Sequence, residues 1–116
     1  MSIERGGIYL AALNPSKGHE PGKVRPVLIL QSDDLTGIGH TTVVVLPLTT
    51  QVIPDTFPLR YPLPPREGLE RASDILCDQI RAIDIRRITS AKLTSLTLKE
   101  LQRVEMQVQI VLGITI

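Results

Sequence analysis

Residues 18–30 read GHEPGKVRPVLIL, a glycine-bounded loop of charged residues that runs directly into an apolar segment. Residues 25–31 are apolar on both faces of a strand, which predicts a central position in a β-sheet. A first strand is predicted before this loop, at residues 8–13, because its β-forming residues end at the turn signal Asn14-Pro15. The loop therefore connects two strands of one sheet.

A third strand is predicted at residues 42–48, where Pro47 favours a bulge or an unpaired edge. A turn-rich connection is expected before it, at residues 32–40. After it, two further strands are expected at residues 57–61 and 73–83, followed by a helical turn at residues 84–88.

The clearest element lies at the C-terminal end of the chain. Thr97 and Glu100 form a capping-box pattern, and apolar residues at helical spacing follow it. We therefore expect a helix over residues 98–112 that ends near Gly113. Several short strands and one terminal helix predict a mainly β fold, a small and strongly bent antiparallel barrel with a C-terminal α-helix.

Composition limits the classes of protein to which the chain belongs. Its 116 residues suffice for one domain, 1–116, and 42% apolar residues suffice for a packed core. The net charge of +1 means that an acidic partner must bind a local patch. No signal-peptide pattern or membrane-length apolar run occurs, and Cys77 is the only cysteine, so a soluble cytoplasmic protein with no membrane partner is expected. Two histidines and one cysteine without ligand spacing predict no metal site and no cofactor.

Several short motifs occur together in a specific order. They are Arg5-Gly6, Asn14-Pro15, Gly18-His19-Glu20-x-Gly22, Arg25-Pro26-Val27-Leu28, Leu48-Thr49 and Asp78-Gln79-Ile80-Arg81-x-Ile83-Asp84. In this arrangement, over nearly its whole length, the chain resembles the MazF/Kid (PemK) toxins of bacterial type II toxin–antitoxin systems. The resemblance implies an SH3-like barrel, a homodimer, and sequence-specific, metal-independent cleavage of single-stranded RNA. It also implies neutralisation by a cognate MazE-like antitoxin.

Arg25 is the first candidate for chemistry. Pro26 forces the residue before it into an extended conformation, and a planar guanidinium suits a phosphate. In metal-free RNA cleavage the 2′-hydroxyl attacks the adjacent phosphorus, so the enzyme must stabilise charge on the non-bridging oxygens and move two protons. By resemblance Arg25 matches the catalytic arginine of the family and Thr49 matches the threonine beside it, while Thr50 is a candidate RNA contact.

Glu20 matches a family glutamate that contacts RNA or orients the arginine. In the Kid branch, acid and base roles belong to a histidine after the loop glycine and to an aspartate in Cys-Asp-Gln, which His19 and Asp78 match. That branch carries an arginine where this chain has Leu76, an apolar residue closer to the MazF branch. Two alternatives stay open, an exposed loop histidine and a buried structural acid, because Asp78 shares strand phase with Leu76.

The remaining candidates are RNA contacts: Lys17, Lys23, Gln79 and Arg81. Gln79 and Arg81 have the opposite strand phase from Asp78, so all three share one groove only if a bulge intervenes. Apolar residues at the C-terminal end, Ile110, Leu112, Ile114 and Ile116, exceed what one helix face needs and predict the dimer surface.

Two alternative functions are a gyrase poison and a non-catalytic nucleic-acid-binding barrel. A gyrase poison of the CcdB type has the same barrel but relies on a tryptophan-containing tail, and this chain has no Trp. A non-catalytic nucleic-acid-binding barrel usually stacks bases on aromatic residues, of which the chain has three, Tyr9, Phe57 and Tyr61.

Overall fold

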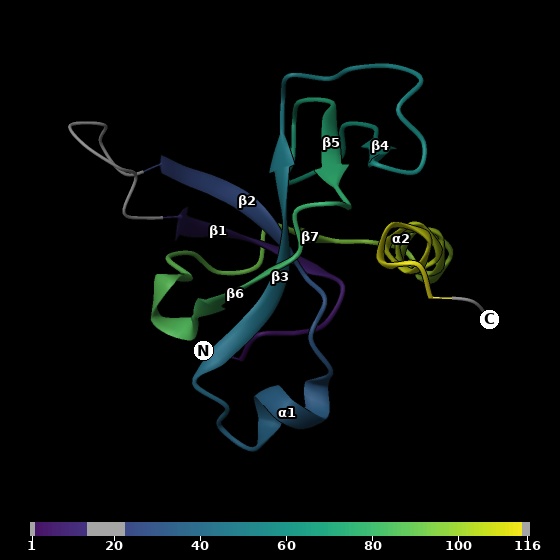
Figure 1. The fold of residues 1–116 in the computed structure, drawn as a ribbon. Coiled ribbons are helices and arrows are strands. Elements are labelled where there is room, and N and C mark those ends of the chain that lie inside the picture. Colours follow the sequence, from purple (N-terminus) through teal and green to yellow (C-terminus); the bar gives the residue numbers. More distant parts are fainter. Residues whose placement is uncertain (1, 14–22, 115–116) are drawn as a thin grey trace, which may run out of the picture.

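Three antiparallel strands form the centre of the fold: β1 (Gly7–Leu13), β2 (Lys23–Ile29) and β3 (Thr42–Thr49) (Figure 1). The structure is a computed structural model that describes residues 2–13 and 23–114. All three predicted strands are confirmed, and β2 lies between β1 and β3 as its apolar character predicted. The fold is a mainly antiparallel β half-barrel with a C-terminal helix, which confirms the predicted mainly β fold class.

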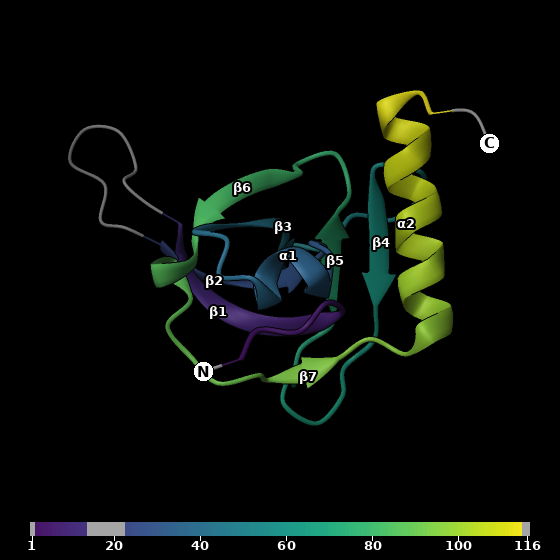
Figure 2. The same cartoon turned by 90° about the horizontal axis from the view of Figure 1, so that it is seen from below.

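Neighbouring residues of the central strands belong to different cores. Leu28 packs into one apolar cluster, whereas Val27 and Ile29 pack into another on the opposite face of the sheet. Because both faces are covered, all three residues are fully buried. Helix α2 (Leu98–Leu112) contributes Leu101, Val104 and Val108 to the first cluster and lies alongside β4 (Arg60–Leu63) (Figure 2).

Strand β3 pairs with different partners along its length. Thr42–Val45 pair with β6 (Arg81–Asp84), whereas Leu48 and Thr49 pair with β5 (Ser73–Leu76), which in turn pairs with β4. Pro47 is aligned with Val27 of β2 on one side. On the other side it lies between the residues that pair with β6 and those that pair with β5, so the predicted unpaired position is found there.

The structure corrects four details of the sequence-based interpretation. The single strand expected at residues 73–83 is two strands, because the chain turns at Cys77 and Asp78, where the Gln79 N–H donates to the Leu76 carbonyl at 3.1 Å. The strand expected at residues 57–61 is β4, which begins three residues later. The connection at residues 32–40 contains the short helix α1 (Asp33–Gly37), and β7 (Thr94–Ser95) was not predicted.

The remaining predictions about local structure are confirmed. The 3₁₀ helix η1 (Ile85–Arg87) is the expected helical turn. Both hydrogen bonds of the capping box are present, from Thr97 N–H to Glu100 and from Glu100 N–H to Thr97. Helix α2 ends at Gly113, whose left-handed conformation (φ 72°) suits glycine. None of the helices in the described residues is long and apolar enough to cross a membrane.

The outer edge of β1 is covered by residues 87–96. Backbone N–H groups of Thr89, Leu93 and Leu96 donate to carbonyls of residues 10, 8 and 6 at 2.9, 2.8 and 2.9 Å. β7 adds two paired residues at Gly7 and Ile8. A strand that would otherwise expose its backbone groups is thereby closed.

Candidate active site

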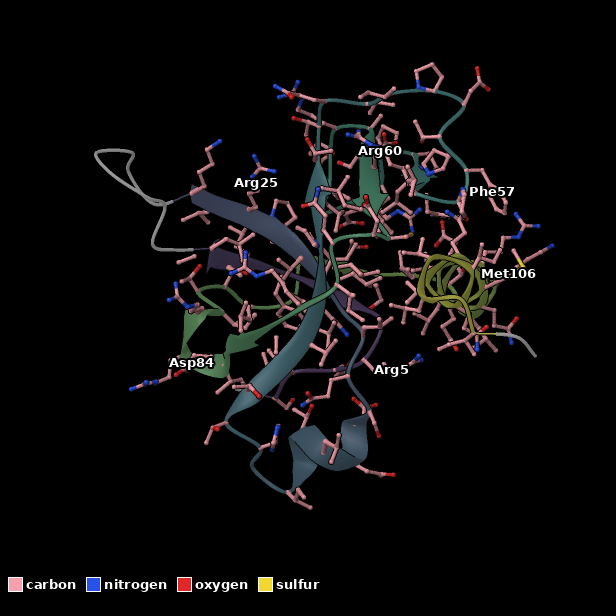
Figure 3. The ribbon with its side chains drawn as sticks, viewed as in Figure 1. Arg5, Arg25, Phe57, Arg60, Asp84 and Met106 are labelled. Atoms are coloured by element: carbon pink, nitrogen blue, oxygen red, sulfur yellow. The ribbon has the colours of Figure 1, made fainter. Side chains whose placement is uncertain are left out.

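Arg25 and Thr49 lie at adjacent ends of β2 and β3. Val27 is aligned with Pro47, and the same register continued by two residues brings Arg25 opposite Thr49. Both residues line one pocket of 230 Å³, here called the Arg25 pocket, together with Val24, Pro26, Leu48, Thr50 and Gln51. Figure 3 shows Arg25 standing away from β2, at the same end of the molecule as Arg60.

The buried part of β2 holds Arg25 in place. Residues 27–29 are fully buried, whereas Arg25 is half-buried at the mouth of the strand. Because Pro26 keeps the preceding residue extended, the guanidinium leaves the strand in a defined direction. A fork of N–H donors on a rigid strand end is suited to bind two oxygens of one phosphate.

Thr49 supplies a second donor to the same pocket. Its Oγ1 accepts a hydrogen bond from the Gln51 N–H at 3.1 Å, which leaves the hydroxyl proton available for another acceptor. Thr50 also lines the pocket but is exposed and follows the strand, whereas Thr49 is half-buried inside it. Thr49 is therefore the less exposed of the two threonines that line the pocket.

The predicted residues of the β5–β6 segment lie outside the Arg25 pocket. Asp78 and Gln79 are exposed in the turn between the two strands. The alternative of Asp78 as a buried structural acid is therefore wrong, because the strand ends at Leu76 and its phase does not extend to Asp78. Arg81 is exposed at the start of β6 opposite Val45, four residues or about 13 Å along β3 from Thr49.

Among the predicted loop cations, Lys23 is exposed at the start of β2, where it lies on the same face as Arg25. Lys17, His19 and Glu20 lie outside the described residues, as does Ile116 of the predicted dimer surface. The structure thus brings together Arg25, Thr49 and Thr50 in one pocket, and it places Gln79 in the β5–β6 connection and Arg81 on β6, both outside that pocket.

Comparison with known proteins adds an independent observation. The family described as "PemK-like, MazF-like toxin of type II toxin-antitoxin system" matches residues 4–112. Endoribonuclease EndoA of Bacillus subtilis is 38% identical over 118 aligned residues, which cover 98% of this chain and 97% of that protein. The chain belongs to this MazF-like toxin family.

Solved structures of the family share the fold. A MazE–MazF crystal structure from Deinococcus radiodurans matches with a TM-score of 0.80 and 23% identity, covering 99% of both chains. The Mycobacterium tuberculosis toxin MazF-mt6 matches with a TM-score of 0.78 and 23% identity, covering 95% of this chain and 99% of that one. The resemblance inferred from the short motifs is therefore confirmed for family and fold.

One cluster of this MazF-like chain was missed by reasoning from sequence. Asp74 of β5 is only 1% exposed and forms an ion pair with Arg60 of β4, with 3.1 Å between Arg60 Nη1 and Asp74 Oδ2. The available signal was an acid within the apolar run of residues 73–77, since a buried carboxylate needs a partner. The identity of that partner could not be read from the sequence.

Cys77 is a residue of the hydrophobic core. It is fully buried, and burial, followed by the charge of Asp78, raises the pKa of its thiol to about 12. The thiol therefore stays protonated near neutral pH and is a poor nucleophile. Within residues 2–13 and 23–114, no three His, Cys, Asp or Glu side chains gather as a metal site.

Proposed function

We propose that this chain cleaves single-stranded RNA at short sequence motifs by attack of the 2′-hydroxyl on the adjacent phosphorus. The coarser statement, a toxin endoribonuclease of a type II toxin–antitoxin system, follows from family membership and from the similarity to Endoribonuclease EndoA. The finer proposal is supported by one observation: Arg25 and Thr49 line the same pocket from adjacent strand ends.

The proposed reaction is balanced without a metal ion. The 2′-oxygen forms a bond to phosphorus as it loses its proton, the bond from phosphorus to the 5′-oxygen breaks, and the 5′-oxygen gains a proton. The products are a 2′,3′-cyclic phosphate and a 5′-hydroxyl. Arg25 stabilises the charge on the non-bridging oxygens and Thr49 donates one further hydrogen bond.

The proton acceptor and the proton donor are proposed by resemblance. Glu20 and His19 lie in the loop before β2, outside the described residues, and match family positions. Asp78 is exposed in the β5–β6 turn and does not line the Arg25 pocket, so we propose Glu20 first. His19 and Asp78 take the proton-transfer roles only in the Kid-type alternative, which the His19→Ala variant tests.

Incubation of the pure protein with a defined RNA in EDTA tests the proposal. We expect fragments whose 5′ ends accept phosphate from polynucleotide kinase without prior phosphatase treatment, and whose positions reveal the recognised motif when sequenced. RNA binding without cleavage would indicate the non-catalytic barrel. Trapping of gyrase on DNA would indicate the gyrase poison.

We further propose that the protein acts in the cytoplasm as a homodimer that a cognate antitoxin neutralises. The related structure from Deinococcus radiodurans is a MazE–MazF pair. Exposed apolar residues follow the outer side of α2 and its end: Met106, Ile110, Leu112 and Ile114. The segment with exposed Phe57 and Leu59 adjoins them, because Gln107 of α2 donates to the Pro58 carbonyl at 2.9 Å (Figure 3).

Sedimentation at micromolar concentration tests the dimer. Ile110→Glu should shift the protein to the monomer, because a charge on an apolar interface loses its hydration. Leu35→Glu on α1 is the matched control, since Leu35 and Ile110 are both 46% exposed. A wild-type monomer, or equal effects of the two changes, would contradict the proposed surface.

A further inference from the structure

Asp74 of β5 is the neighbour of Thr49 on the adjacent strand. The two residues are aligned in the β3–β5 pairing, and Asp74 is almost completely buried. Its Oδ2 accepts hydrogen bonds from the Ile53 N–H at 3.0 Å and from Arg60 Nη1 at 3.1 Å. A buried carboxylate with two such donors is an anchor for the groups that donate to it.

The same guanidinium reaches the chain that follows Thr49. Arg60 Nη1 also donates to the Gln51 carbonyl at 2.9 Å, and the Gln51 N–H donates to Thr49 Oγ1 at 3.1 Å. Residues 51 and 53 are therefore attached to one ion pair. The contacts run from Asp74 through Arg60 and Gln51 to the Thr49 hydroxyl.

Neither member of the ion pair lines the Arg25 pocket. Thr49, Thr50 and Gln51 form one wall of that pocket, whereas Arg60 and Asp74 line the adjacent pocket of 340 Å³ beside residues 52–57. Arg60 and Asp74 therefore reach the Arg25 pocket only through the backbone that they hold.

We propose that Arg60 and Asp74 are positioning residues, which fix the Thr49 hydroxyl and the Gln51 wall relative to Arg25. This inference rests on the proposed function. Thr49 is the last residue of β3, and Gln51 lies in the loop that follows it. A donor displaced by about 1 Å from a phosphate in the transition state can lower a rate about a hundredfold. The ion pair prevents that displacement.

Single-turnover cleavage of a short RNA separates positioning from mere stability. Arg60→Met should lower the cleavage rate at saturating protein by about ten- to a hundredfold, with a change in apparent affinity of about threefold or less. Arg66→Met is the matched control: Arg66 is also in an ion pair, with Glu100, and its side chain is 20% exposed against 21% for Arg60. Arg66→Met should destabilise the fold and leave the rate of the folded protein within about twofold.

A double variant separates the two roles again. Arg60→Met with Asp74→Leu replaces a buried ion pair by apolar groups, which often preserves stability. We expect near wild-type unfolding and a cleavage rate as low as that of Arg60→Met. Recovery of the rate in the double variant, or equal rate losses in Arg60→Met and Arg66→Met, would overturn the inference. A loss confined to affinity and its salt dependence would instead make Arg60 a direct RNA contact and would also overturn it.

NMR resonances of the backbone amides give a readout that does not depend on cleavage. Arg60→Met should shift the amide resonances of Thr49, Thr50 and Gln51, and Arg66→Met should leave them unchanged. If the wild-type protein does not cleave RNA, the proposed function fails, and these resonances still report whether the ion pair holds the segment. Unchanged resonances in Arg60→Met would refute the positioning role in either case.

Discussion

At the scale of single residues, the candidate site combines one charged and one neutral donor on two strands. Arg25 offers a planar fork, and Thr49 offers a hydroxyl whose oxygen already accepts the Gln51 N–H at 3.1 Å. Arg25 carries the larger share of transition-state stabilisation, because its guanidinium brings a full positive charge and two parallel hydrogen bonds to the phosphate, whereas a hydroxyl brings one hydrogen bond and no charge. Substitutions at the two positions should differ accordingly.

Arg25→Ala should reduce the cleavage rate by a factor on the order of 10²–10³, because it removes a preorganised charged donor. Arg25→Lys should recover little of this loss, since a point charge does not span two oxygens. Thr49→Ala should reduce the rate less, because a neutral hydrogen bond contributes less. Single-turnover rates, with circular dichroism as a check on folding, measure all three. Near wild-type cleavage by Arg25→Ala would contradict the proposed site.

Substitution of His19 distinguishes a Kid-type site, in which the histidine transfers a proton, from a MazF-type site, in which it does not. A rate loss in His19→Ala as large as that in Arg25→Ala would indicate proton transfer by the histidine, as in the Kid branch that the chain resembles at this position. We expect a smaller loss, because Leu76 matches the apolar residues of the MazF branch. The pH dependence of cleavage provides a second measurement, because an inflection near neutral pH that is lost in His19→Ala would indicate a titrating histidine.

At the scale of elements, one carboxylate at the N-terminus of α2, that of Glu100, makes several hydrogen bonds. Glu100 accepts the Thr97 N–H at 2.9 Å and binds Arg66 through two hydrogen bonds of 2.8 and 2.6 Å. Hydrogen bonding from Arg66 is the main cause that lowers the pKa of Glu100 to about 2, against the opposing effect of burial. Both side chains are mostly buried, so solvent screens this pair little.

This pKa makes stability depend on pH in a defined window. Because the pKa of Glu100 is lower in the folded chain than in the unfolded chain, its contribution is complete above about pH 4.5 and is lost as the pH falls toward 2. Glu100→Gln should lower the free energy of unfolding by about 2 kcal/mol at pH 7, and the difference from wild type should shrink toward pH 2. Urea unfolding at several pH values measures this.

Glu105→Gln is the control on the same helix. Glu105 forms an ion pair with Arg5 at 3.3 Å, and its side chain is 39% exposed, so its loss should change stability by less than about 1 kcal/mol. An equal effect of the two substitutions would contradict the special role of Glu100.

The elements differ in how far the sequence predicts them, and the reasons are physical. β2 and α2 follow from local signals, a doubly apolar strand and a capping box. The β5–β6 turn contains no glycine or proline, and β7 has only two residues, so both depend on tertiary pairing. Arg25 and Thr49 were predictable through short family motifs, whereas the Arg60–Asp74 pair joins residues 14 positions apart that no local pattern connects.

At the scale of the whole molecule, the small number of basic side chains near the site limits how many RNA phosphates the protein can neutralise. Arg86 is paired with Asp84 at 2.8 Å and Arg87 donates to the Ala12 carbonyl at 3.1 Å, so neither is a strong candidate for phosphate. Lys23, Arg25 and Arg81, with Lys17 outside the described residues, are the candidates on or near the site. The number of phosphates neutralised per site is therefore small.

RNA binding should accordingly depend modestly on salt. A slope of about −0.7 per phosphate contact in a plot of log affinity against log salt gives a total of about −2 to −4. Arg81→Gln should reduce the slope by about one contact, whereas Arg86→Gln should leave it unchanged. Fluorescence anisotropy with a short, non-cleavable RNA at several salt concentrations measures the slopes. A wild-type slope near zero would place the RNA on another surface.

The cover over the outer edge of β1 has a consequence during biosynthesis. Gly7 pairs with Ser95, 88 positions later (95 − 7), so the ribosome makes the first strand long before the segment that closes it. A chain that stops at residue 86 retains β1, β2 and β3 but exposes the backbone of β1, and open edges pair with other chains. We therefore expect interrupted translation to yield aggregates instead of a smaller folded protein. Light scattering during cell-free synthesis of chains ending at residues 86 and 116 would show it, and a monodisperse 86-residue product would refute it.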